Sequence, residues 1–305
     1  MVDVLVLLLG FICAGAGGEL FVRGIVGVAR VTRVPPGIVA VTLAAFATSS
    51  PELAVAINAA LEQTPEISLG DALGRNIVNI ALILGLVAAV AAIHVPKDSL
   101  RRDYPAALLV PLLIGALAYD GTLTRADGVA LLVTFVLWLT LTVIEAWRRR
   151  SAAESVLAET RPWLATVQCT IGLSLLVAAG RLIVIGALGI ATTFDLDRFV
   201  IGATLVAIGT SIPELATALI SRLRGHDEVG LRTILGSNIF NGLFVIGVAA
   251  TITPIRVNWN EVALMLIFGF IAVAAIFSGL GGTIGRRQGL LLLALYITSV
   301  LVVLW

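Results

Sequence analysis

Long apolar stretches separated by short polar breaks run through the whole chain. About 20 consecutive apolar residues are enough to cross a bilayer as a helix. Ten such stretches can be separated, and the first and sixth exceed one crossing, which indicates tilt. The pattern predicts an all-α polytopic membrane protein with ten transmembrane helices. The predicted spans are 2–30, 36–62, 67–93, 103–118, 125–147, 162–190, 198–224, 229–251, 258–278 and 283–304.

Composition supports the same class. Of the 305 residues 59% are hydrophobic and 13% are charged, and the mean hydropathy is +1.07. Soluble proteins carry about a quarter charged residues. The short alternating strands of a transmembrane barrel are absent from the pattern. A net charge of +1 gives no reason to expect nucleic acid as a partner. We expect the lipid bilayer as the surroundings and a monomer as the functional unit.

The segment 1–18 superficially resembles a signal peptide that ends in small residues. A signal peptide requires a basic start, whereas the only early charge here is Asp3. We therefore interpret this segment as part of the first helix. Cys13 and Cys169 lie inside apolar runs, where free cysteine behaves as a small hydrophobe. They indicate neither a disulfide framework nor a metal site.

Basic residues predict the orientation. Nearly all Lys and Arg residues in or beside the predicted connections belong to odd-numbered connections, and the exceptions are Arg125, Arg198 and Arg256. Cytoplasmic loops carry an excess of Lys and Arg. The odd-numbered connections are therefore predicted to be cytoplasmic, with both termini outside the inner (plasma) membrane.

The chain also repeats itself. One constant shift, called here the repeat offset, brings 42–56 onto 204–218 and 73–79 onto 235–241 without a gap. We predict a first five-helix repeat over 1–147, a cytoplasmic linker over 148–161 and a second repeat over 162–305. Because five is odd, the second repeat enters the membrane from the opposite side. Many secondary transporters use such inverted repeats for alternating access; the alternative is a duplication kept for structural reasons alone.

Charged residues inside the predicted spans are the candidates for function, because a charge at the bilayer centre costs a few kcal/mol and normally has a partner or a substrate. The basic residues are Arg23, Arg75 and Arg181, and the acids expected opposite them are Glu19, Glu52 and Glu214. Arg23 lies four residues after Glu19, the spacing of a structural ion pair on a helix.

Glu52 and Glu214 occupy equivalent positions, each after Thr-Ser-X-Pro. Proline removes one helical hydrogen bond and disturbs the carbonyls about four residues earlier. Thr48 and Thr210 lie four residues before the two acids and share a helix face with them. Carboxylates, hydroxyls and free carbonyls suit hard cations such as Ca²⁺ and Na⁺. The alternative is a pair of kinked helices whose carboxylates bond to backbone.

Four asparagines recur at equivalent places in the predicted third and eighth helices. Asn79 and Asn241 are predicted to line the site, whereas Asn76 and Asn238 serve helix packing at least as well.

The paired TS-x-PEL and G-x-N-x-x-N motifs resemble the two alpha-repeats of the cation/calcium exchanger superfamily, particularly its prokaryotic sodium/calcium exchanger branch. The resemblance covers nearly the whole chain and implies a secondary-active antiporter, not an enzyme, that needs no cofactor. It implies that Ca²⁺ leaves in exchange for Na⁺, or for protons in some branches. It further implies that Glu52, Glu214 and the carbonyls of Thr48 and Thr210 bind Ca²⁺. Residues that would help to bind Na⁺ are Ser49, Ala45, Ser211, Ala207 and Ser237, with Asn79 and Asn241 beside the central site.

The sequence departs from this family at two positions. Arg75 stands where the second motif usually has serine, and Asn241 stands where many members carry aspartate. Arginine is always charged in proteins. Two carboxylates, one Ca²⁺ and Arg75 would sum to +1, and two unit charges 4 Å apart interact by about 4 kcal/mol at an effective dielectric constant near 20.

Three interpretations of Arg75 stay open. It fills one sodium position and changes the stoichiometry or the coupling ion, or it points away or pairs with Glu19, or it disables transport and leaves a sensor or scaffold. An ion channel is disfavoured by the inverted repeat with two central carboxylates. We expect Arg75 to lie within hydrogen-bonding reach of Glu52 or Glu214, because buried arginine seeks a carboxylate.

Overall fold

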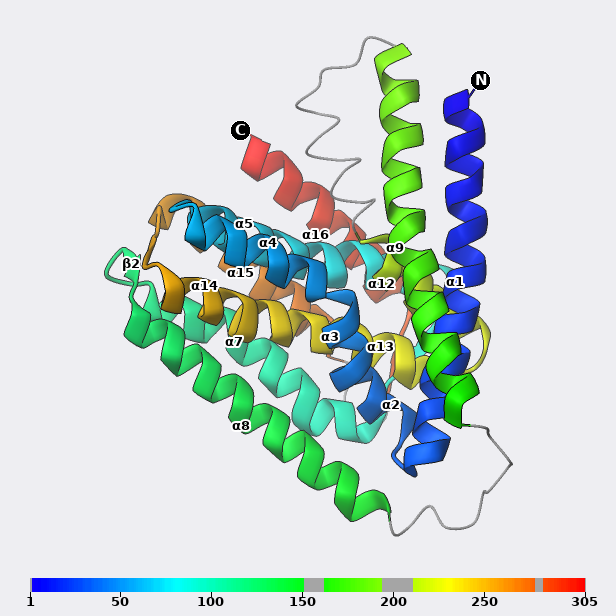
Figure 1. Cartoon of the computed structure of the whole chain (residues 1–305). Coiled ribbons are helices and arrows are strands. Elements are labelled where there is room, and N and C mark those ends of the chain that lie inside the picture. The colour runs from blue at the N-terminus through cyan, green and yellow to red at the C-terminus, as the bar shows by residue number, and fades with distance from the viewer. Residues whose placement is uncertain (1, 151–161, 194–210, 278–281, 305) are drawn as a thin grey trace.

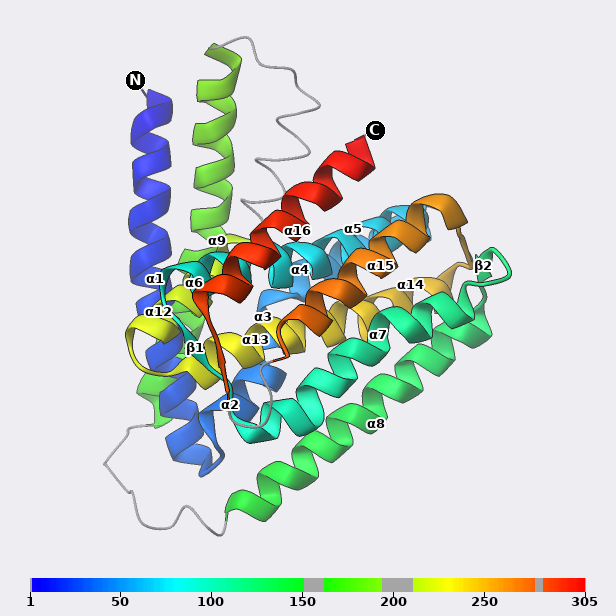
Figure 2. The ribbon, with the colours of Figure 1, turned by 180° about the vertical axis from the view of Figure 1, so that it is seen from behind.

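The computed structural model describes residues 2–150, 162–193, 211–277 and 282–304, which are mostly helical (Figures 1 and 2). In the first half the helical elements are α1 (Val2–Thr32), α2 (Pro36–Val39), η1 (Ala40–Ala44), α3 (Ala45–Thr48), α4 (Ser50–Leu61), α5 (Glu66–Ile77), η2 (Val78–Leu84), α6 (Gly85–Val90), η3 (Ser99–Asp103), α7 (Tyr104–Leu117) and α8 (Arg125–Arg150). In the second half they are α9 (Pro162–Thr193), α12 (Ile212–Leu223), α13 (Asp227–Ile239), η6 (Phe240–Val245), α14 (Ile246–Ile252), α15 (Trp259–Ala275) and α16 (Arg286–Leu304).

Several of these helices can cross a membrane. Among the described residues, five helices are long and apolar enough, or six when the bent pair of 36–48 and 50–61 counts as one span. Each predicted span overlaps helical residues of the structure, although the start of the seventh, 198–210, lies outside the described residues. The count of ten crossings stays a prediction.

The third and eighth predicted spans form the centre of the molecule. In the span formed by α13, η6 and α14, 89% of an apolar 18-residue stretch is buried. In the span formed by α5, η2 and α6 the buried share is 67%. The corresponding share is only 28% for α1 and for α8, which fits helices that face lipid. These two spans are therefore the most buried of the five long apolar helices.

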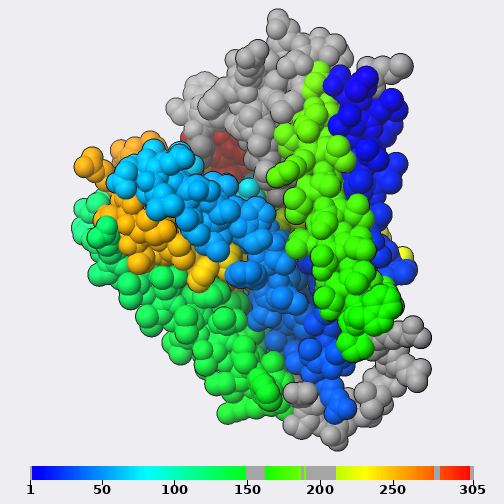
Figure 3. All heavy atoms as spheres, in the orientation of Figure 1, coloured from blue at the N-terminus to red at the C-terminus, as the bar shows by residue number. Residues whose placement is uncertain are grey.

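Helices α1 and α9 lie side by side as a long antiparallel pair at one edge (Figures 1 and 3). Glycines allow this close approach, because a Cβ atom at Gly24 would lie 2.5 Å from the Cys169 nitrogen. A Cβ atom at Gly172 would likewise clash with the backbone nitrogen of Phe21. Small residues are common where membrane helices pack closely.

The repeat seen in the sequence recurs as matching elements. Helices α4 and α12 are separated by the repeat offset, and each is followed by a helix that continues into a π-helix, η2 or η6. Four two-residue strands connect the halves crosswise. Strand β1 (Ile93–His94) pairs with β4 (Thr283–Ile284), and β2 (Thr122–Leu123) pairs with β3 (Ile255–Arg256), both antiparallel.

A buried ionic network anchors the start of α13, the helix that carries Ser237 and Asn238. Fully buried Asp103 accepts a hydrogen bond from Arg102 Nε at 2.6 Å and pairs with Arg232 Nε at 3.3 Å. Arg102 also reaches Glu145 on α8 at 2.5 Å. The network therefore joins η3, α8 and α13, which come from both halves of the chain.

Candidate cation site

The second predicted span breaks where the motif Thr-Ser-X-Pro stands. The segments 36–48 and 50–61 meet at an angle of 45° at Ser49, whose φ is −96° and ψ is 7°. Ser211 has nearly the same angles, −95° and 8°, before α12. Proline two residues later cannot donate a backbone hydrogen bond, and the Ala47 carbonyl instead accepts one from Ser50 Oγ at 3.0 Å. The predicted single helix over 36–62 is therefore two helical pieces.

Glu52 and Glu214 lie in the first turns of α4 and α12, immediately after these breaks. Their residues are only 6% and 4% exposed. Backbone N–H groups at a helix N-terminus favour negative charge, so each broken helix presents a partial positive charge to its own carboxylate. The fold thereby holds two acids in an interior where lone acids are rare.

Arg75 connects α5 to α4 through an ion pair. Its Nη1 lies 2.6 Å from Oε1 of Glu52, and it also interacts electrostatically with Glu214. The prediction that Arg75 reaches one of these acids is confirmed. Pairing with Glu19 was the wrong alternative, because the Glu19 carboxylate binds Arg23 and Arg224 at 2.5 and 2.7 Å. The Glu19 side chain is also partly exposed, unlike the buried acid that the sequence predicted.

Asp71 is a further charged residue of this cluster that the sequence prediction left out. Its carboxylate accepts from Arg75 Nε, with distances of 3.0 and 3.2 Å to its two oxygens. The signal was present in the chain, since Asp71 lies four residues before Arg75 and shares its helix face. With Asp71 counted, Glu52, Glu214, Asp71 and Arg75 carry a formal charge of −2. One Ca²⁺ would balance this charge, whereas the sum of +1 from the sequence did not include Asp71.

Thr48 brings the two halves together beside the acids. Its hydroxyl lies 3.4 Å from Ser237 Oγ on α13 and donates to the Ala45 carbonyl at 3.2 Å. Ser49 and Ser211 are buried at the two breaks. Two further predicted residues, Ala207 and Thr210, lie outside the described residues.

The four asparagines form a buried cluster between α5–η2 and α13–η6. Asn76 and Asn238 each donate a side-chain hydrogen bond to the other's backbone carbonyl, at 3.1 and 2.9 Å. Asn79 Nδ2 donates to Asn238 Oδ1 at 2.9 Å, and Asn241 Nδ2 donates to Asn76 Oδ1 at 3.4 Å. Asn76 and Asn238 therefore clamp the central helices, as packing residues do.

Three buried oxygens of this region have no hydrogen-bond partner within the described part of the chain. They are Oε2 of Glu52, Oε2 of Glu214 and Oδ1 of Asn241. Buried acceptors normally find a donor, and an oxygen without one can instead coordinate a cation. Carboxylate and amide oxygens are the ligands of Ca²⁺ in proteins. The arrangement thus offers cation ligands from both halves of the chain.

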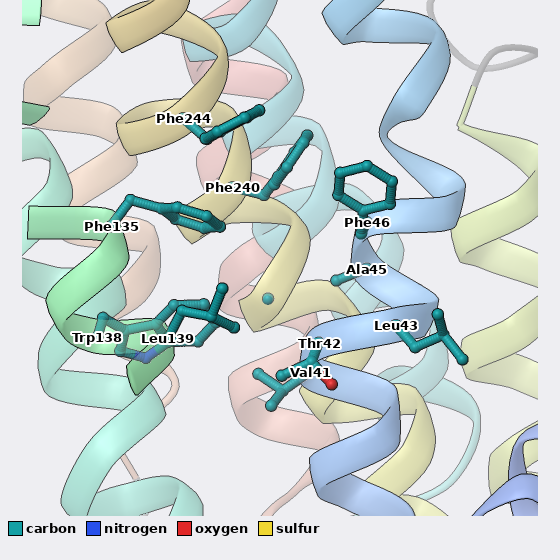
Figure 4. Close-up of a pocket in the computed structure, with 11 residues that line it drawn as sticks. Val41, Thr42, Leu43, Ala45, Phe46, Phe135, Trp138, Leu139, Phe240 and Phe244 are labelled. Carbon is teal, nitrogen blue, oxygen red and sulfur yellow. The ribbon is translucent and has the colours of Figure 1, made fainter. Parts of the chain in front are cut away.

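A cavity lies on each side of the broken helix 36–61. One of about 360 Å³ is lined by Thr48, Glu52, Arg75 and Pro213, and by α9 residues that include Arg181. The other, of about 440 Å³, is apolar and lies between η1–α3, α8 and η6 (Figure 4). There the rings of Phe46 and Phe240 meet edge to face, with centroids 5.3 Å apart. The charged residues of the two linings therefore all lie around the first cavity.

Comparison with known proteins identifies the family. A family model described as sodium/calcium exchanger protein matches residues 2–144 and 164–305. The chain belongs to the sodium/calcium exchanger family. The resemblance that the two motifs indicated is confirmed, and the chain is a membrane antiporter of the exchanger type.

Relatives and a solved structure of the sodium/calcium exchanger family match most of the chain. The inner membrane protein YrbG of Escherichia coli is 39% identical over 236 residues, which cover 74% of this chain and 72% of YrbG. The sodium/calcium exchanger MaX1 of Methanosarcina acetivorans is 26% identical and covers 100% and 99% of the two chains. The exchanger NCX_Mj, soaked with zero Na⁺ and Ca²⁺, superimposes with a TM-score of 0.82 at 32% identity over 98% of both chains.

Proposed function

We propose that this exchanger exports Ca²⁺ across the inner membrane in exchange for Na⁺, and that it binds both ions between Glu52 and Glu214. The observation that carries the proposal is the set of three unpaired acceptor oxygens on Glu52, Glu214 and Asn241. They come from helices of both repeats, and a cation is the partner that such acceptors lack. A cation there compensates for the cost of burying the carboxylates.

The ligand assignment follows the family resemblance. Glu52, Glu214 and the carbonyls of Thr48 and Thr210 hold Ca²⁺. The additional positions that serve Na⁺ are Ser49, Ala45, Ser211, Ala207 and Ser237, with Asn79 and Asn241 beside them. Burial of the described members of this set supports the assignment, because ion ligands must be shielded from bulk water to select a dehydrated ion.

The architecture proposed for this cycle is a ten-helix inverted repeat. Its two domains are 1–147 and 162–305, joined by a cytoplasmic linker over 148–161. The constant repeat offset between matching elements supports the repeat. Figure 1 places both ends of the chain toward the same end of the molecule, which supports two termini on one side, here the outside. Rocking of one repeat against the other would expose the site alternately.

Arg75 is proposed to occupy one of the sodium positions. Its guanidinium already pairs with Glu52 at 2.6 Å, as a bound monovalent cation would. A fixed cation at that place reduces the number of Na⁺ ions that can bind. The alternatives to this role of Arg75 are an exchanger coupled to protons and a chain that has lost transport.

Uptake of ⁴⁵Ca²⁺ into proteoliposomes tests the function, with Na⁺ and pH gradients imposed separately. We expect uptake that follows the Na⁺ gradient. Glu52→Gln and Glu214→Gln should each reduce it at least 100-fold, because glutamine keeps size and one acceptor oxygen but removes the charge that offsets ion dehydration.

Glu62→Gln is the matched control, since Glu62 is exposed at the end of α4, and it should transport normally. Size-exclusion profiles of the purified variants would show that the chains are folded. Uptake driven only by the pH gradient would instead assign proton coupling. No uptake under either gradient would identify a sensor or scaffold, and wild-type flux in either site variant would refute the site.

A further inference from the structure

We propose that Asp71, acting through Arg75, fixes the charge of the ion site at −2, so that exchange of two Na⁺ for one Ca²⁺ is electroneutral. This inference rests on the proposed function, whose ions and site it shares. Asp71 is a positioning residue in this scheme, because it contacts Arg75 and not the proposed ion ligands.

The guanidinium of Arg75 is held at two of its nitrogens. Nη1 pairs with Glu52 and Nε pairs with Asp71, and the side chain is 18% exposed. A charge-assisted arrangement of this kind fixes both the position and the orientation of the arginine. Arg75 therefore stays beside the site as a permanent positive charge while ions come and go.

The ion pair exists in only one of the two repeats. At the repeat offset, Thr233 stands in place of Asp71 and Ser237 in place of Arg75. Thr233 donates to the Val229 carbonyl at 2.8 Å, and Ser237 lies beside Thr48. Both positions of the second repeat are neutral. The first repeat thus carries an added cation together with an added anion, four residues apart.

This pairing decides how many ions neutralise the site. The two glutamates alone carry −2, Arg75 alone would change the sum to −1, and Asp71 restores it to −2. Arg181 lines the same cavity, but its residue is exposed, so it is not counted with the ion-paired cluster. A poorly hydrated site tolerates net charge badly. It therefore closes around one Ca²⁺ or around two Na⁺, and no net charge crosses the membrane in a complete cycle.

Steady-state ⁴⁵Ca²⁺ accumulation at a fixed Na⁺ gradient tests this, with the membrane potential set by K⁺ and valinomycin. For the wild type we expect the accumulation ratio to change less than twofold over about 59 mV. Arg75→Gln leaves a charge of −3 that admits a third monovalent ion. Its ratio should change about tenfold over the same potential, the factor for one transferred charge.

Asp71→Asn should lower the apparent Ca²⁺ affinity at least tenfold, because the site then carries only −1. The double variant Asp71→Asn, Arg75→Gln returns the charge to −2, and both Ca²⁺ affinity and voltage independence should recover. A merely structural role for Asp71 predicts no such recovery.

Arg23→Gln is the matched control, because Arg23 is exposed and pairs with Glu19 at the same four-residue spacing; its ratio should equal that of the wild type. Na⁺-driven Ca²⁺ uptake whose ratio changes tenfold over about 59 mV in the wild type would overturn the inference and leave the proposed function intact. So would an Asp71→Asn variant with unchanged Ca²⁺ affinity. Absence of any gradient-driven Ca²⁺ uptake in the wild type would overturn both.

Discussion

Asn76 and Asn238 join the two halves through the same hydrogen bond made in both directions. Each amide donates to the backbone carbonyl of the other residue, and both residues are buried. Each such bond contributes about 0.5–1.5 kcal/mol net, whereas a buried carbonyl left without a partner costs about 1–3 kcal/mol. The two bonds therefore add little net stability, but breaking them is costly, so they fix how the two helices pack.

Asn76→Ala should lower the free energy of unfolding by about 1–3 kcal/mol, because the buried Asn238 carbonyl loses its side-chain donor. Denaturant unfolding in detergent measures the change. Asn58→Ala is the control, since the exposed Asn58 amide donates to Ala54 in its own helix, and it should change stability by less than about 0.5 kcal/mol. Equal losses in the two variants would contradict the clamp.

The charged cluster shows what the residue types alone could and could not predict. The buried position of Arg75 and its contact with a site carboxylate were predicted from the motif and from the need of buried arginine for a partner. Its second partner, Asp71, was not predicted. The four-residue spacing makes that contact possible, but the choice between Asp71, Glu19 and a route toward solvent depends on side-chain rotamers, which the sequence does not determine. The net charge of the site depended on that choice.

At the scale of elements, Gly236 sets the distance between α13 and the broken helix. A Cβ atom there would lie 2.5 Å from the Val41 carbonyl oxygen and 2.8 Å from the Ala45 Cβ. Because the first contact is with backbone, the helices would have to separate. Ser237 and Thr48, which face each other across this contact, would move apart with them.

Gly236→Ala should therefore destabilise the protein by about 1–3 kcal/mol and reduce ⁴⁵Ca²⁺ uptake at least tenfold. Gly115→Ala on α7 is the matched control, because its Cβ would meet only Leu266 Cδ1 at 3.4 Å. Alanine is favoured over glycine in helices by about 0.5–1 kcal/mol, so this variant should keep or gain stability. If Gly236→Ala shows normal thermal unfolding and normal uptake, α13 can shift to make room for the added methyl group, and the prediction is contradicted.

The elements were predicted unevenly. The ranges 2–30 and 125–147 agree closely with α1 and α8, since long apolar runs define them. The break at Ser49 agrees with the disturbance expected before Pro51, although the sequence predicted one continuous span over 36–62. The π-helices η1, η2 and η6 and the two-residue strands had no local signal, because π-turns and short bridges form where packing against distant segments requires them.

For the whole molecule, the distribution of basic residues makes the orientation testable. Alkaline phosphatase, which is active only outside the cytoplasm, should be inactive when fused after Arg150 at the end of α8. Fused after the C-terminal residue, it should be active, because five further crossings separate the two points and the basic connections stay inside. The reverse pattern would invert the topology, and equal activities would refute an odd number of crossings between them.

The internal repeat was the most informative feature of the sequence at this scale. The repeat offset predicted which segments correspond, and α4 and α12 match it residue for residue. It could not predict which segments of the two halves touch. The crosswise pairing of β1 with β4 and of β2 with β3 is a property of how the repeats interlock.

That crosswise pairing has a consequence for biosynthesis. Strand β1 leaves the ribosome long before its partner β4, just as Asn76 does before Asn238. At roughly 5–20 residues per second, the first half waits on the order of 10–40 s with its strand edges and its amide clamp unpaired. During that interval Glu52 can already bind Arg75, and Arg75 can bind Asp71, since all three are synthesised early. The local ion pairs thus leave these three residues with a net charge of −1 while the second half is still being translated.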